Sequence, residues 1–354
     1  MEKKLFLSPG LLITGGVMGF LFAFLGKMGN PANMGICVLC FYRDIAGAIG
    51  LHKITAVSYI RPEIIGFILG ATIFALFTKQ MRATWGAKPI LRFIIGILVG
   101  YNALIFLGCP IRMFGRISAG DWTALFGLLG VIIAVIVFNY FVKSGLSMGR
   151  SLETKNGKFL AWLTPLIGII LLILLIFDPT GVNKKHTAHA PILMSLGAGI
   201  LLGILGQWSS FCSLGGTLDL VIIKSFHRVQ GTIAFLIVAF IANLAFGQFK
   251  SGAHPIAHTA NLWNLLSMFV IGFGSIMLGG CPFKQTIMAS RGNLDSLIAI
   301  FGMFVGIAIG HNFNIVASPK GVPIQAISGV IVSIIFLLLI GITSIERVSK
   351  TPKG

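Results

Sequence analysis

Apolar runs dominate the chain, and each is close to the length that a membrane-spanning helix needs. They fall at about residues 10–26, 63–78, 90–108, 122–142, 159–177, 191–206, 231–247, 262–279, 294–311 and 323–343. A helix needs roughly 20 apolar residues to cross the hydrocarbon core of a bilayer, so several of these runs are short. We expect about ten spanning helices and an all-α polytopic membrane protein.

Four semi-polar pieces that carry glycine and cysteine interrupt this pattern, at residues 31–50, 109–120, 209–226 and 281–292. Irregular backbone is tolerated at membrane depth only where it is buried in protein or lines a wet cavity. We therefore expect short, broken or re-entrant helices here, in the interior of the molecule.

Composition supports a membrane protein and excludes a nucleic-acid partner. Only 10% of the 354 residues are charged, against about 25% in soluble domains. The net charge of +18 comes from basic residues in short loops between apolar runs. Such residues orient a protein in the lipid bilayer, and no basic stripe with interleaved aromatic residues points to nucleic acid.

The distribution of basic residues predicts the orientation. If the N-terminus is cytoplasmic and all ten runs span, 17 of the 27 lysines and arginines lie on the inner side. This is the excess that the positive-inside rule requires, and it places both termini in the cytoplasm. We interpret the N-terminal apolar run as a retained first helix, because no clear small-residue cleavage site follows it.

The chain also repeats itself. The stretch "LGCPIRMFGRISAGD" (107–121) matches "GGCPFKQTIMASRGNLD" (279–295), and the distance from Cys40 to Cys109 equals that from Cys212 to Cys281, 69 residues. We predict a first repeat at 1–150, a span and linker at 151–190, and a second repeat at 191–354. Five spans separate the starts of the two repeats, so the repeats have inverted topology, as in many transporters.

The shared unit is Gly-Cys-Pro followed two residues later by a cation. Its members are Gly108, Cys109, Pro110 and Arg112 in the first copy and Gly280, Cys281, Pro282 and Lys284 in the second. Proline starts a helix well, so the preceding cysteine is expected at the N-cap. There the free N–H groups and the helix dipole attract an anion and favour a thiolate. The alternative interpretation is that the cysteine is a small buried apolar residue and the cation an ordinary loop charge. That interpretation would suffice for a single Gly-Cys-Pro unit, but it explains less well why the unit occurs twice.

Cys37 and Cys40 lie three residues apart, so we expect them on one face of a helix. A zinc site would need a second pair with comparable spacing, so we predict no metal site and no cofactor. A redox pair remains an alternative: "CVLCFYRD" is similar to the reactive pair of DsbB, a membrane disulfide oxidase. On that reading the protein is a membrane thiol–disulfide oxidoreductase that uses Cys37 and Cys40.

Other polar residues allow two interpretations. Carboxylates beside the cysteine segments either couple transport to an ion or pair with nearby cations; they are Asp44, Asp121, Asp219 and Asp295. The histidine pairs favour exposed or interfacial positions over a metal site; they are His254 with His258 and His186 with His189.

Long motifs carry a family resemblance. The stretches "GNPANMGICVLCFYRDIAGAIGLH", "YIRPEIIGFILGA", "LGCPIRM" and "LGGCPFKQTIMASRGN" resemble the YeeE/YedE sulfur-transport membrane proteins, in particular the YedE-type members associated with selenium. The resemblance implies a multi-pass protein of the bacterial inner membrane, a transporter rather than an enzyme, that imports a small soft sulfur- or selenium-containing anion.

The resemblance also implies a path along pore-facing cysteines. Carried onto this chain, the relay uses Cys109 and Cys281, an entry thiol at Cys37 or Cys40, and Cys212 as the counterpart in the second half. It further implies a small TusA-like carrier protein in the cytoplasm that receives the imported atom. A thiol suits the soft end of such an anion, and helix N-termini with a cation suit its charged oxygens.

Overall fold

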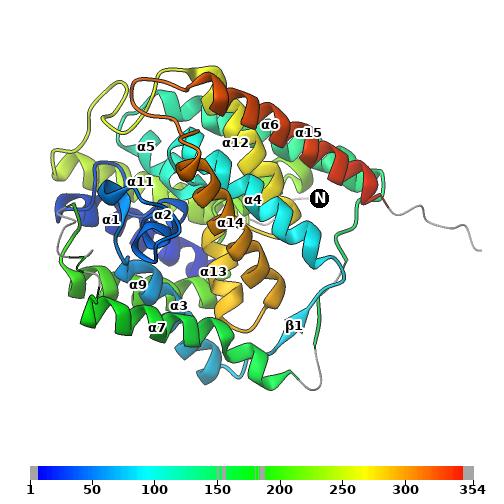
Figure 1. Cartoon of the computed structure of the whole chain (residues 1–354), viewed down its shortest axis with the longest axis horizontal. Coiled ribbons are helices and arrows are strands. Elements are labelled where there is room, and N and C mark those ends of the chain that lie inside the picture. The colour runs from blue at the N-terminus through cyan, green and yellow to red at the C-terminus, as the bar shows by residue number, and fades with distance from the viewer. Residues whose placement is uncertain are drawn as a thin grey trace, which may run out of the picture.

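In the part of the chain that the structure describes, ten long helices account for the ten apolar runs, and Figure 1 shows how they are arranged. The computed structural model describes residues 7–149, 151–153, 157–179, 181, 183 and 188–345. The long helices are α1 (Pro9–Lys27), α3 (Pro62–Phe77), α4 (Pro89–Phe106), α6 (Thr123–Lys143), α7 (Leu163–Phe177), α9 (Ile192–Ser209), α11 (Val229–Ala245), α12 (Asn261–Met277), α14 (Leu294–Asn312) and α15 (Ile324–Thr343). Within the described ranges, nine helical stretches are long and apolar enough to cross a membrane, and α11 is shorter. The prediction of an all-α polytopic membrane protein is confirmed.

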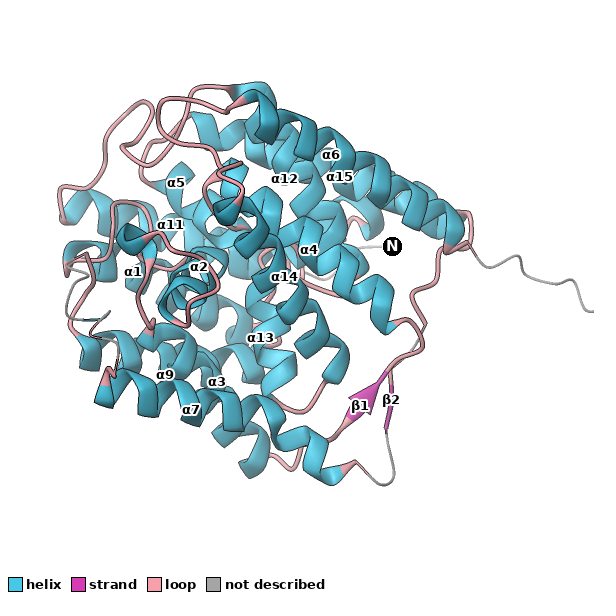
Figure 2. Cartoon of the chain, in the orientation of Figure 1, coloured by secondary structure: helices cyan, strands magenta, loops and turns pink. Residues whose placement is uncertain are grey.

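The four semi-polar pieces each form a short helix. These are α2 (Val38–Ala48), α5 (Pro110–Ser118), α10 (Gly215–Leu218) with a π-helical turn at Asp219–Ile223, and α13 (Pro282–Ser290). Short 3-10 turns occur at Thr55–Val57 and Lys158–Trp162. A single two-residue pair, β1 (Thr84–Trp85) antiparallel to β2 (Leu152–Glu153), joins two loops at the edge of the molecule (Figure 2).

The long helices of the first half have their main partners in the second half. Helix α1 packs on α11, α3 on α9, α4 on α14 and α6 on α12. These pairs are symmetric between the halves. If α1 is taken as equivalent to α9, α3 to α11, α4 to α12 and α6 to α14, then exchanging the equivalent helices gives the same four pairs. Two halves related by a two-fold axis have this arrangement, and the five long helices before α9 give the halves opposite directions. The boundaries at residues 150 and 191 stay a prediction.

Backbone contact between the paired helices is close because glycines lie where they meet. A Cβ atom added at Gly15 of α1 would lie 1.9 Å from the carbonyl oxygen of Gly231 in α11. A Cβ at Gly302 of α14 would lie 2.2 Å from the carbonyl oxygen of Phe93 in α4. Small residues at such positions allow the close approach on which helix association in membranes depends.

Loops from both halves hydrogen-bond to one another at each end of the bundle. At one end the Lys250 N–H donates to the Ala119 carbonyl (3.0 Å). At the other end the Arg82 N–H donates to the Arg291 carbonyl (3.0 Å). The loops thus alternate between the two ends, as the predicted crossings require. Which end faces the cytoplasm stays a prediction, and the chain termini lie outside the described residues.

Candidate functional site

Both Gly-Cys-Pro units form the predicted helix start. Cys109 is the N-cap of α5 and Pro110 its first residue; Cys281 is the N-cap of α13 and Pro282 its first residue. Proline fixes the first helical turn, so the cysteine before it lies where the free N–H groups point. The cysteine is therefore placed at the positive end of a short interior helix.

The glycine of each unit makes room for the cation of the same unit. A Cβ added at Gly108 would lie 2.8 Å from Cδ of Arg112, and one at Gly280 would lie 2.6 Å from Cδ of Lys284. In both copies the aliphatic stem of the cation passes over the glycine. The two copies therefore share a three-dimensional arrangement. In each copy the aliphatic part of the cationic side chain lies over the glycine, and the thiol lies at a helix N-terminus.

The first cluster gathers three thiols. Cys37 is the N-cap of α2, and its sulfur accepts the backbone N–H of Cys40 at 3.4 Å. The Cys37 thiol is also hydrogen-bonded to those of Cys40 and Cys109. Cys37 therefore precedes the helix rather than sharing a face of it with Cys40, although the two sulfurs still lie close together. All five cysteines of the chain are free and buried.

Arg112 completes the first cluster and is only 1% exposed. Its Nε donates to the Asn33 carbonyl (2.8 Å), its Nη1 to the Cys40 sulfur (3.5 Å) and the Leu107 carbonyl, and its Nη2 to the Ile256 carbonyl (3.3 Å). None of the ion pairs in the described chain includes Arg112. The guanidinium thus brings a buried positive charge to the sulfurs with only neutral partners.

The second cluster has two thiols and an open cavity. The Cys281 N–H donates to the Cys212 sulfur at 3.3 Å, and the two thiols are hydrogen-bonded. A cavity of about 170 Å³ is lined by Cys212, Lys284, Arg228 and the glycines at 279 and 280. A free thiol and two cationic side chains therefore share one small space.

Lys284 differs from Arg112 in having no hydrogen-bond or ion-pair partner in the part of the chain that the structure describes. Its charge acts on the Cys212 sulfur. Arg228, the N-cap of α11, pairs with Asp219 at 3.4 Å and leaves 47% of its side chain exposed. No sequence pattern indicated Arg228, because its loop has a different length from the corresponding loop of the first half.

The equal 69-residue spacing makes Cys40 the counterpart of Cys212, but the contacts in the structure make Cys37 its counterpart. The thiols of Cys37 and Cys212 each bond to the cysteine of the Gly-Cys-Pro unit in their own half. Each is also followed seven residues later by an aspartate that pairs with an arginine. Cys37 is thus the structural counterpart of Cys212, and Gly215, three residues after Cys212, stands where the first half has Cys40. This glycine lines the cavity of the second cluster.

The four aspartates beside the cysteine segments all pair with arginines, as the interpretation of these carboxylates as partners of nearby cations predicts. The pairs are Asp44 with Arg43 and Arg61, Asp121 with Arg116, Asp219 with Arg228, and Asp295 with Arg92. The Asp44–Arg61 and Asp121–Arg116 pairs are buried, at 2.6 and 2.8 Å. Hydrogen bonds and opposite charge satisfy these carboxylates where they stand.

The expectation of exposed histidines is wrong for His254 and His258, which are both buried. His254 is hydrogen-bonded to the Ala119 carbonyl (3.1 Å) and His258 to the Ile105 carbonyl (2.8 Å). These hydrogen bonds hold the loop before α12 against the helix bundle. Burial lowers the pKa of His258. His189 stacks on the ring of Tyr59, and His186 lies outside the described residues.

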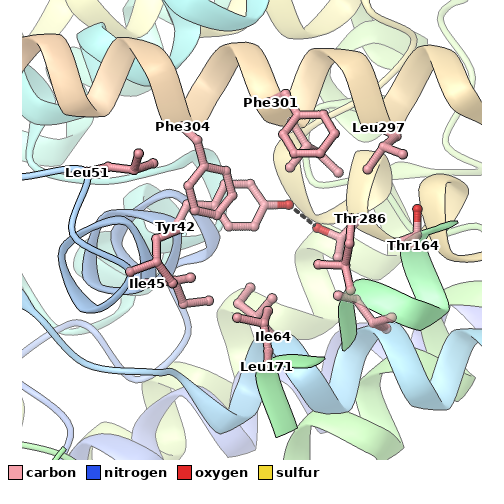
Figure 3. A pocket seen from close by; sticks show the side chains of 14 residues that line it. Tyr42, Ile45, Leu51, Ile64, Thr164, Leu171, Thr286, Leu297, Phe301 and Phe304 are labelled. Atoms are coloured by element: carbon pink, nitrogen blue, oxygen red, sulfur yellow. Dashed lines mark hydrogen bonds between the residues drawn. The ribbon is translucent and has the colours of Figure 1, made fainter. Parts of the chain in front are cut away.

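Tyr42 connects the two clusters. Its hydroxyl in α2 is hydrogen-bonded to the hydroxyl of Thr286 in α13 (2.6 Å), and the phenol interacts electrostatically with both Cys109 and Cys281. Figure 3 shows this contact at the wall of an apolar crevice of about 160 Å³ between α2, α3, α7, α13 and α14. The short helices of the two halves thus meet between the sulfur clusters.

Two comparisons relate the chain to known proteins. Residues 208–351, which contain the second cluster, match the protein-family model described as sulphur transport. The chain is 30% identical over 123 residues to the thiosulfate transporter TsuA of Escherichia coli (strain K12). That alignment covers 33% of this chain and 34% of TsuA, so the similarity spans about a third of the relative's length. Over residues 208–351 the chain is therefore similar to the family of sulphur-transport proteins.

Proposed function

We propose that the protein imports a small anion with a soft sulfur or selenium end, such as thiosulfate or a selenium analogue. The observation that carries this proposal is the cavity of the second cluster, where Cys212 shares about 170 Å³ with Lys284 and Arg228. The cations attract the charged oxygens, and the polarizable sulfur is suited to the soft end. Sulfate has no soft end and gains little from the thiol.

The anion passes between the clusters along the five cysteines. Arg112 attracts it to Cys37, Cys40 and Cys109, and Lys284 and Arg228 attract it to Cys212 and Cys281. Every thiol in this path is buried and free, and the sulfurs of Cys37 and Cys212 each accept a backbone N–H, which supports transfer by hydrogen-bond exchange. Such a transfer forms and breaks S–H···S contacts and needs no covalent step.

The protein works in the bacterial inner membrane with both termini in the cytoplasm. In that orientation the first cluster is the outer one and the second the inner one. Arg228 is partly exposed at the inner cluster. The anion therefore leaves beside an accessible cation, where a TusA-like carrier protein with a receiving thiol can dock.

Uptake into proteoliposomes tests the substrate. Purified protein is offered labelled thiosulfate, selenite and sulfate in parallel, at equal concentrations. We expect uptake of thiosulfate or selenite and none of sulfate. Equal uptake of all three, or of none, would contradict a site selective for a soft anion.

Cysteine variants test the path. Cys109→Ala and Cys281→Ala are each expected to abolish uptake while the folded protein stays in the membrane, and Ser328→Ala, an exposed change in α15, serves as the control. Since Cys37 rather than Cys40 is the counterpart of Cys212, Cys37→Ala should lower uptake more than Cys40→Ala. Normal uptake by both Gly-Cys-Pro variants would end the relay hypothesis.

One contact favours the alternative function of a thiol–disulfide oxidoreductase: the sulfurs of Cys37 and Cys40 lie close together. As a membrane thiol–disulfide oxidoreductase the protein would reoxidise a dithiol partner when quinone is present. Alkylation mapping of membranes distinguishes the two functions. Both cysteines always reduced supports transport, and a disulfide between them that turns over with quinone supports the oxidoreductase.

A further inference from the structure

The carboxyl group of Glu63 is buried and has no cationic partner among the residues that the structure describes. Glu63 lies in the first turn of α3 and is 1% exposed. Its Oε1 accepts hydrogen bonds from the Asn30 amide (2.9 Å) and the Ser195 hydroxyl (3.0 Å). Its Oε2 has no hydrogen-bond partner among the described residues. A buried carboxyl with a vacant oxygen has a place for a proton, and ionisable groups inside membrane proteins commonly serve function.

The other buried acids in the described chain do not share this feature. Asp44, Asp121, Asp219 and Asp295 are each paired with an arginine. Taking a proton would break an ion pair in each of them. Glu63 can gain or lose a proton while its two hydrogen bonds to Oε1 stay in place.

The second half supplies an internal comparison. Arg61 and Glu63 begin α3, and Arg228 and Gln230 stand at the same places at the start of α11. The Oε1 of Gln230 accepts a hydrogen bond from the Ser8 N–H (3.0 Å). An amide therefore fulfils the packing role at this position of the fold. What the carboxyl of Glu63 adds over an amide is the ability to titrate.

Charged groups around Glu63 connect it to the first sulfur cluster. Arg61 donates to the Asn30 amide oxygen (3.2 Å) and to Asp44 in α2 (2.6 Å), and Asp44 also pairs with Arg43. Two arginines and two carboxylates give this group no net charge when Glu63 is ionised. The group has a net charge of +1 when Glu63 is protonated.

That positive charge lies close to the thiols. Asp44 is one helical turn beyond Cys40 in α2, and the charge of Arg43 acts on the sulfurs of Cys37 and Cys40. Among the described residues, Tyr59 interacts with the charge of Glu63, and His189 stacks on Tyr59. Protonation of Glu63 therefore makes the surroundings of the first cluster more positive and favours an anion there.

We propose that Glu63 is the proton-coupling site of the transporter. The proposal rests on the proposed function. Glu63 takes a proton from the outer side of the membrane, the anion binds at the thiols of the first cluster, and the proton leaves after the anion has moved to the second cluster. Because the coupling is reciprocal, a bound anion also raises the affinity of Glu63 for its proton. The proton helps the anion to enter a cell whose interior is negative.

The test compares wild type, Glu63→Gln and the control Glu153→Gln, an exposed carboxylate at the edge of the molecule. Exchange of labelled for unlabelled thiosulfate is measured in proteoliposomes at equal pH on both sides. Net accumulation is measured with the outside one pH unit more acidic and the membrane potential clamped. A trapped pH dye reports proton entry in wild type.

We expect exchange in all three proteins. Wild type and Glu153→Gln should accumulate thiosulfate up to about tenfold, the proton ratio for one coupled proton; Glu63→Gln should accumulate none. Gradient-driven accumulation by Glu63→Gln would overturn the coupling role, as would loss of exchange in folded Glu63→Gln. Thiosulfate entry without proton entry in wild type would also overturn it, whether or not the variant folds. Absence of exchange in wild type would instead contradict the proposed function.

Discussion

Substitution by glutamine should have different effects on the two cations of the repeated unit, Lys284 and Arg112. Lys284 has no partner in the described structure and points into the cavity of the second cluster, so Lys284→Gln removes charge and little else. Two unit charges about 4 Å apart interact by about 4 kcal/mol at an effective dielectric constant near 20. Since the cavity is partly open, we expect a loss of roughly 1.5 to 3 kcal/mol in anion binding. That loss is about a ten- to hundredfold rise in KM.

Arg112→Gln has a different cost. It leaves the carbonyls of Asn33, Leu107 and Ile256 without a donor inside the protein. An orphaned buried acceptor costs about 1 to 3 kcal/mol, so we expect destabilisation of at least about 3 kcal/mol and little folded protein. The structure thus predicts a transport defect for one cation and a folding defect for the other.

Two measurements check this contrast: the thiosulfate concentration for half-maximal uptake, and the melting temperature in detergent. Lys284→Gln should shift the first and leave the second within about a degree of wild type, because no partner is lost. An unchanged concentration for half-maximal uptake in Lys284→Gln would refute the anion-binding role. A melting temperature that falls as far as that of Arg112→Gln would refute the inference that Lys284 is unpartnered.

Three further outcomes follow from the packing. Gly15→Ala should lower stability by about 1 to 3 kcal/mol, because its Cβ meets a carbonyl oxygen of α11 at 1.9 Å; the neighbouring Gly16→Ala, with only ordinary contact, is the control for thermal denaturation. Tyr42→Phe and Thr286→Val should each cost about 1 kcal/mol, and the double variant no more than the larger single loss; additive losses would show that the bond between α2 and α13 does not stabilise the fold. Because burial lowers the pKa of His258, the unfolded chain binds a proton below about pH 6.5 that the folded chain resists. Melting temperature should therefore fall on acidification from pH 7 to 5, and fall less steeply in His258→Asn.

The sequence predicted the helices well because lipid imposes a simple rule on each of them. Every run of apolar residues became a long helix, since a backbone in hydrocarbon must satisfy its own hydrogen bonds. The starts of α5 and α13 were equally predictable, because Pro110 and Pro282 determine them locally.

The site was harder to predict where contacts are distant in sequence. The equal spacing pointed to Cys40 as the counterpart of Cys212, but the loop after α2 is longer than the loop after α10, and only the thiol contacts identify Cys37. Arg228 was missed for the same reason. The burial of His254 and His258 depends on a loop that folds against α4 and α5, which no local pattern reports.

The exchange of partners between the halves has a consequence for biosynthesis. Helix α1 begins at Pro9 and its partner α11 at Val229, so 220 residues separate the two. At about 5 to 20 residues per second, α1 waits roughly 10 to 40 s in the bilayer before α11 has been made. During that time its glycine-lined surface faces lipid or a temporary neighbour. The first half therefore passes through a long-lived inserted stage without its final helix contacts, during which insertion factors or membrane proteases have access to it.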